Sequence, residues 1–197
     1  DAAFARGTVR LAPFGEAGFT LPFYPGMPVI GVSPRTLVTR LDHAESAEGL
    51  DLLCCMERHR ASGEIGRAYV SGFGLRGGAI ASTVGHDSHN VAVIGDNARD
   101  MAAAVRALAP DGGLSVCSGG KVTKAALDIA GLMSSRTAEE ALAERRALSS
   151  ALDELCREPG IEPFMLLSFL TLTVIPEAKL NTKGLYDVAH GAYVYRG

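Results

Sequence analysis

The sequence predicts an α+β fold: a mixed, mostly antiparallel sheet or sheets, with two or three helices packed against them. Short apolar runs, typical of strands, are concentrated before the helical stretches instead of alternating with them. A Ser-Gly-Gly turn at 118–120 directly joins two such runs, which is typical of an antiparallel hairpin. With 197 residues, 47% of them hydrophobic, the chain is long enough to bury a substantial core.

Eight short runs of apolar and β-branched residues predict strands. Gly, Pro, Ser or polar clusters bound them, including predicted turns at 33–35 and 61–63 and a polar loop at 42–49. The predicted strands are 29–32, 36–41, 51–57, 65–70, 79–84, 91–94, 114–117 and 121–126.

Two helices follow from capping signals and a 3.6-residue period. Asn97 is placed as the N-cap of a helix at 98–108, which Pro110 and the glycines after it end. Thr137 and Glu140 have the spacing of a capping box before a helix that runs to about residue 156, ahead of Pro159-Gly160.

The C-terminal part is less clearly patterned. Residues 163–170 suit a short helix and 170–174 a strand, but the runs are too short for periodicity to decide between helix and strand. Residues 180–184 predict a turn, and 185–194 form a weakly patterned end.

The organisation predicted is an arm at 1–28, leading from a preceding domain, and one α+β domain at 29–197. The arm carries Pro, Gly and scattered aromatics without a period, and its aromatics indicate that it packs on a neighbouring domain. No signal peptide is recognised, and because the first residue is Asp, we expect a processed product or a piece of a longer chain.

The net charge and the cysteine spacing argue against certain classes of partner and of metal site. A net charge of −3 gives no reason to expect nucleic acid or an anionic membrane, and the longest apolar stretch, 164–175, is too short to span a bilayer. The cysteines lack CxxC spacing, so a thiolate zinc site is not expected, and buried free thiols in a cytoplasmic protein are the favoured interpretation. The four are Cys54, Cys55, Cys117 and Cys156.

The main candidate site is a polar cluster between the predicted strands 79–84 and 91–94: His86, Asp87, Ser88, His89 and Asn90. In an extended chain Asp87 and His89 would share a face, and the carboxylate could set the tautomer of a catalytic imidazole. In a turn His86 and His89 would come together and could hold a metal. A turn satisfied by its own backbone is about equally expected.

Glu57, Arg58 and His59 form a second candidate group, at the end of an apolar strand. A solvated strand end is the favoured interpretation of this group taken alone. No Gly-x-Ser-x-Gly, HExxH, Walker or barrel-strand His-x-His motif occurs, so the residues alone show no complete catalytic constellation.

A family resemblance emerges from these motifs taken in order. Over about 29–188 the chain resembles the C-terminal domain of bacterial and archaeal adenine deaminases. The segments that carry the resemblance are Glu57-Arg58-His59, Gly63-x-Ile65-Gly66, Gly72-Phe73-Gly74-Leu75, Gly78-Ala79-Ile80-Ala81-Ser82, His86-Asp87-Ser88-His89-Asn90, Gly131-Leu132-Met133-Ser134, Pro163-Phe164-Met165-x-Leu167-Ser168-Phe169-Leu170 and Val174-Ile175-Pro176-Glu177-x-Lys179-Leu180.

The resemblance implies part of a hydrolase that converts adenine and water to hypoxanthine and ammonia. In that family a divalent metal (manganese, iron or zinc) activates water on an N-terminal amidohydrolase barrel. This chain lacks the barrel, so no cofactor is expected in it and it is expected to be inactive alone. The barrel is the expected partner domain, adenine the substrate, and a homo-oligomer an open alternative.

Site roles follow from the same resemblance. His86, Asp87 and His89 are the candidate catalytic residues, while Ser88, Asn90, Glu57 and His59 are candidates for binding substrate or ordering the pocket. Two other functions stay open: a stand-alone binding module for a purine or similar small ligand, and a small metalloenzyme based on His86 and His89.

Overall fold

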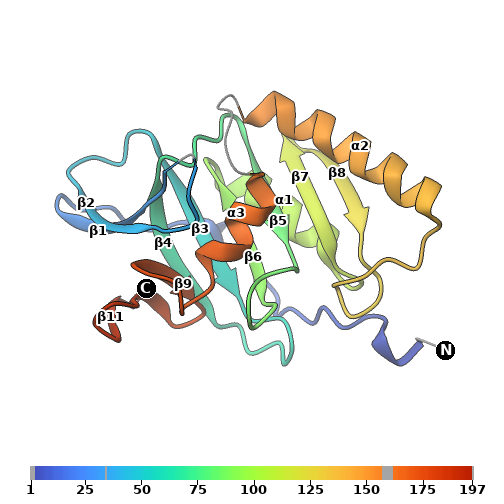
Figure 1. Ribbon diagram of the computed structural model, residues 1–197, viewed down its shortest axis with the longest axis horizontal. Helices are drawn as coiled ribbons and strands as arrows, with labels where there is room; N and C mark the ends of the chain where they lie inside the picture. The colour runs from blue at the N-terminus through green and yellow to red at the C-terminus, as the bar shows by residue number, and fades with distance from the viewer. Residues whose placement is uncertain (1–2, 34, 157–161, 197) are drawn as a thin grey trace.

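An eight-stranded mixed sheet forms the centre of the molecule. The computed structural model describes residues 3–33, 35–156 and 162–196, with strand order β2-β1-β4-β3-β6-β5-β7-β8 (Figure 1). The pair β1–β4 is parallel and the other neighbours are antiparallel. The strands are β1 Met27–Gly31, β2 Arg40–Ala44, β3 Leu50–Met56, β4 Ile65–Ser71, β5 Gly78–Ser82, β6 Val91–Gly95, β7 Gly113–Ser118 and β8 Lys121–Ala126.

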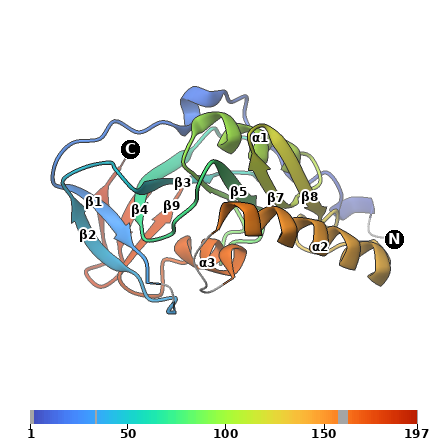
Figure 2. The ribbon, with the colours of Figure 1, turned by 90° about the horizontal axis from the view of Figure 1, so that it is seen from above.

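Helices cover both faces of this sheet (Figure 2). On one face, α1 (Ala98–Leu108) packs across β5, β6 and β7. On the other, α2 (Ala138–Leu155) lies over β7 and β8, and α3 (Pro163–Leu170) over β5 and β6. A small antiparallel sheet of β9 (Ala178–Asn181), β10 (Gly184–Asp187) and β11 (Ala192–Tyr195) contacts β4 beside α3.

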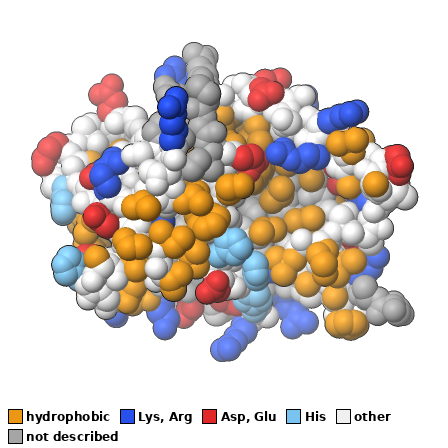
Figure 3. All heavy atoms as spheres, viewed as in Figure 1, with side chains coloured by type: hydrophobic (Ala, Val, Ile, Leu, Met, Phe, Trp, Pro, Cys, Tyr) orange, Lys and Arg blue, Asp and Glu red, His pale blue; other side chains and the backbone are white. Residues whose placement is uncertain are grey.

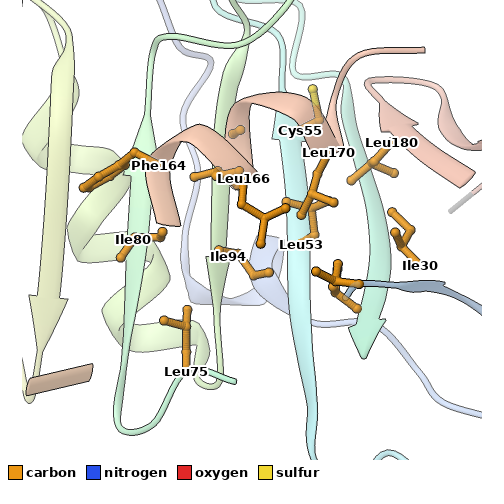
Figure 4. Packing of buried hydrophobic residues seen from close by; sticks show 14 of the residues in the cluster. Ile30, Leu53, Cys55, Leu75, Ile80, Ile94, Phe164, Leu166, Leu170 and Leu180 are labelled. Atoms are coloured by element: carbon orange, nitrogen blue, oxygen red, sulfur yellow. The ribbon is translucent and has the colours of Figure 1, made fainter. Parts of the chain in front are cut away.

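Alternating strand residues divide the core into two clusters. Cys55 lies in the cluster on the α3 side of the sheet and its neighbour Cys54 in the cluster on the α1 side, as period-2 alternation requires. Figure 4 shows Phe164, Leu166 and Leu170 of α3 directed at the strands of the first cluster. The described part of the chain contains no helix long and apolar enough to cross a bilayer.

The N-terminal segment packs on the α1 side. Residues 16–19 form a 3-10 helix that contacts α1, and Phe19 is buried, with its ring 5.7 Å from that of Phe14. Phe23 lies edge-on to Tyr69 of β4. A link from this segment to a preceding domain stays a prediction.

The predicted α+β class is confirmed, and so are both predicted helices. Asn97 accepts a hydrogen bond from the backbone N–H of Asp100, and Thr137 and Glu140 form the predicted capping box of α2. Helix α2 ends at Leu155, in agreement with the end predicted at about residue 156. Pro159 and Gly160 lie outside the described residues, as does Pro34 of the turn predicted at 33–35.

Two local predictions are wrong. The second strand is Arg40–Ala44 instead of 36–41, because an edge strand with exposed and half-buried side chains needs no apolar run. Residues 171–177 form turns, not a strand, while the helix at 163–170 is confirmed. The turn predicted at 180–184 is confirmed, since residues 182–183 form the turn of a hairpin; the two strands of that hairpin, β9 and β10, were not predicted because four residues are too few to show a period.

Candidate functional site

Two connections lie side by side at one end of the large sheet. Residues 57–64 join β3 to β4, and residues 83–90 join β5 to β6. They meet because the last residue of β3, Met56, pairs with the first residue of β6, Val91. The chain thereby places both candidate groups, from segments about thirty residues apart, in one loop cluster.

Arg58 holds this cluster together from inside. Its side chain is 2% exposed; Nε donates to the carbonyl oxygen of His89, and Nη2 donates to that of Ala130 at 3.0 Å. No carboxylate among the described residues forms an ion pair with it. Burial lowers the pKa of Arg58 from its ordinary value, but an arginine stays charged, so a buried cation is fixed by two backbone carbonyls.

The polar side chains near Arg58 also bond to the loop. The ring Nε2 of His59 lies 2.8 Å from the carbonyl oxygen of Ser88, and because a carbonyl only accepts, the ring donates. The Oδ1 atom of Asn90 accepts from the backbone N–H of Arg58 at 3.4 Å. His59 and Asn90 therefore order the cluster.

Glu57 organises its own connection. Its carboxylate accepts hydrogen bonds from the backbone N–H groups of His59, Arg60 and Ser62, at 2.5, 2.8 and 3.0 Å. Partial burial alone would raise the pKa of Glu57, but these hydrogen bonds outweigh it, and the pKa lies below its ordinary value. Glu57 is thus an ionised loop cap.

His89 is held in one tautomer. Its Nδ1 accepts from the backbone N–H of Gly85 at 3.3 Å, so the neutral ring carries its hydrogen on Nε2. The pKa of His89 is lowered, first by burial and next by the positive charge of Arg58. A neutral imidazole with Nε2–H can donate a hydrogen bond to a ligand at neutral pH.

His86 and Asp87 lie on the outer part of the loop. Residues 86–88 form a turn, and the ring centroids of His86 and His89 are 6.2 Å apart. His86 packs edge-on against Phe169 of α3, with 5.2 Å between ring centroids. The side chain of Asp87 is exposed. The sequence left an extended chain and a turn open for this segment, and the structure has the turn.

Buried hydroxyls hold the base of the loop. Thr83 is fully buried; its Oγ1 donates to the carbonyl oxygen of Gly131 at 2.6 Å and accepts from the N–H of Gly113 at 2.9 Å. Ser82 bonds to Val84 in both directions. These contacts and those of Arg58 tie residues 83–90 to the 129–133 segment.

Two cavities among the described residues lie beside the sheet, and residues 86–90 line neither of these two. One, of about 330 Å³, lies between the N-terminal segment and the start of α1. The other, of about 270 Å³, includes Glu57 and residues 12–15 in its wall. No group of three or more His, Cys, Asp or Glu side chains that could hold a metal ion occurs among the described residues.

The structure therefore gathers all the candidate residues into one cluster but gives them different surroundings. The side chains of Glu57, His59 and Asn90 form hydrogen bonds with the backbone of the two connections. The side chains of Asp87 and Ser88 are exposed, and those of His86 and His89 are half-buried. Sequence reasoning missed Arg58 as an anchor and Phe169 as a neighbour of His86. No local pattern marks either residue, because their partners lie far away in the chain.

Comparison with known proteins gives one consistent family. Residues 35–192 match the family described as the adenine deaminase C-terminal domain. The chain is 46% identical over 197 residues to an adenine deaminase of Nitratidesulfovibrio vulgaris, covering 93% of this chain and 34% of that protein. It is 41% identical over 172 residues to an adenine deaminase of Bacillus licheniformis, covering 81% and 30%. The chain thus spans about a third of the length of these relatives.

Proposed function

The chain belongs to the family of adenine deaminase C-terminal domains, and from this premise we propose that it is the C-terminal part of a hydrolase that converts adenine and water to hypoxanthine and ammonia. The observation that carries the proposal is the family match over residues 35–192, together with relatives named adenine deaminase that are about three times as long as the matched region. The missing two thirds would supply the catalytic domain.

The partner we propose is an N-terminal amidohydrolase barrel that carries a divalent metal, manganese, iron or zinc. The described residues of this chain do not fit a metal site, because no cluster of three or more ligand side chains is present in them. Residues 1–28 would be the arm from that barrel, and residues 29–197 the domain that packs on it. We expect the full-length enzyme in the cytoplasm.

The roles we propose within the loop cluster follow from its contacts. Arg58 and His59 hold residues 86–90 in place, and Asn90 joins this run to the backbone of Arg58. Glu57 orders the connection that carries Arg58 and His59. The loop can then present the Nε2–H of His89, the ring of His86 and the carboxylate of Asp87 to a ligand pocket that the barrel completes. Because His89 is kept neutral and in one tautomer, it suits donation of a hydrogen bond to a purine.

The activity of two proteins tests this proposal. The full-length protein should release ammonia from adenine, and the isolated 197-residue chain should not. Deamination by the isolated chain, or a full-length protein with no activity on adenine, would refute the proposal. Adenine should leave the melting temperature of the isolated chain unchanged; a rise that depends on adenine concentration would support a stand-alone purine-binding module instead.

A further inference from the structure

The helix α3 has no polar outer face. From Pro163 to Pro176 the chain carries no charged residue, and Glu162 and Glu177 flank this stretch. The inner side of α3, including Phe164 and Leu166, fills the core against β5 and β6 (Figure 4). A helix that is apolar on all sides is typical of one covered on all sides.

Part of the outer side of α3 and of the segment after it is nevertheless exposed. Met165 is 50% exposed, and Val174, in the loop after the helix, is 66% exposed. Phe169 is half-buried against the ring of His86. In Figure 3, hydrophobic side chains gather across the middle of this face, with histidines among them. An exposed apolar patch with a polar rim is typical of an interaction surface.

The neighbouring helix α2 shows the contrast on the same side of the sheet. Apart from Leu142, which is 50% exposed, its large outward side chains are mostly charged, as expected for a helix that faces water: Glu139, Arg145, Arg146, Asp153 and Glu154. Two adjacent helices therefore carry different surfaces, one suited to water and the other to contact with protein.

We propose that α3 and residues 171–176 form the surface on which the N-terminal part of the full-length protein docks. This inference rests on the proposed function, which supplies the occupant: about two thirds of each relative lies outside the matched region, and the family is that of a C-terminal domain. Because His86 contacts Phe169, a domain seated on α3 also reaches the 86–90 loop.

Glutamate substitutions in the full-length protein test the docking surface. Met165→Glu and Val174→Glu each place a charge in the proposed interface, whereas Val122→Glu is the matched control. Val122 is 37% exposed and pairs with Cys117, whose side chain lies in the α1-side cluster. Because directly paired residues project on the same face of a sheet, the side chain of Val122 also lies on the α1 side, opposite to α3. If Met165→Glu disturbs the fold, Val174→Glu, which lies outside any helix or strand, carries the test.

The two measurements are the rate of protease cleavage between the two parts and kcat/KM for adenine. Both interface variants should speed cleavage and lower kcat/KM by roughly tenfold or more, with Val122→Glu like the parent. Parental cleavage rates in both interface variants, or equal effects in the control, would overturn the docking proposal. A change in oligomeric state with parental cleavage would assign the face to a second copy and overturn it as well. A parent without adenine deaminase activity would refute the proposed function, while the cleavage rates would still decide the docking surface.

Discussion

Replacing Arg58 with Met is the sharpest test of how the loop cluster is held. The change keeps an unbranched apolar stem in place of that of arginine and removes both guanidinium hydrogen bonds, those to the carbonyl oxygens of His89 and Ala130. An unsatisfied buried acceptor costs about 1–3 kcal/mol. Because removing a buried charge also recovers part of its desolvation cost, we expect a net loss of about 2 kcal/mol in the free energy of unfolding.

Urea denaturation at neutral pH measures this loss, and Arg60→Met is the control. Arg60 is an exposed arginine in the same connection, and its replacement should change stability by less than about 0.5 kcal/mol. A second readout is the NMR titration of the His89 ring. Since the charge of Arg58 helps to lower the pKa of His89, that pKa should rise in Arg58→Met. If stability and the His89 titration both match the parent, Arg58 is not the anchor of the loop.

Three further substitutions test the rest of the fold. Burial raises the pKa of Asp51 to about 6 from 3.8, so the folded protein is most stable, relative to its stability at high pH, below about pH 4, where this carboxyl is protonated, and that stability is lost as the pH rises through 6. Asp51→Asn should therefore exceed the parent in urea stability at pH 7 by up to about 3 kcal/mol and lose this advantage near pH 4. Burial lowers the pKa of Lys179 to about 8 from 10.5, so between these pH values the unfolded chain binds more protons than the folded protein. The free energy of unfolding of the parent should therefore rise from pH 8 to 10.5, and that of Lys179→Met should not. A Cβ at Gly66 would overlap the carbonyl oxygen of Asn181, so Gly66→Ala should lower the melting temperature and cost about 3 kcal/mol, whereas Gly18→Ala, with open space around it, should behave like the parent.

The elements that sequence predicted well are those whose signals are local. A cap and a stripe of apolar residues define α1, and a capping box defines the start of α2. The alternation that sends Cys54 and Cys55 to opposite faces also needs only neighbouring residues. The edge strand β2 was missed because its side chains are exposed or half-buried and form no apolar run, and the strands β9 and β10 were missed because four residues are too few to show a period.

For the candidate site, too, the sequence predicted the features that depend on local signals and missed those that depend on distant contacts. The polar run at residues 86–90 could be found from composition, because five polar residues between two buried strands are unusual. The roles within it could not be assigned, because Arg58 approaches from another connection and Phe169 from a helix about eighty residues later. Sequence could indicate where the site lies, and the contacts were needed to separate the side chains that hold the loop from those that can meet a ligand.

Steady-state kinetics of the full-length protein with His86→Ala and His89→Ala combined test the central claim most directly. His43→Ala is the matched control, since His43 is an exposed histidine on the edge strand β2. If the loop faces the adenine pocket, kcat/KM for adenine should fall by roughly tenfold or more in the double variant and stay at the parental value in the control. Parental kinetics in a correctly folded double variant would mean that residues 86–90 form only a structural turn.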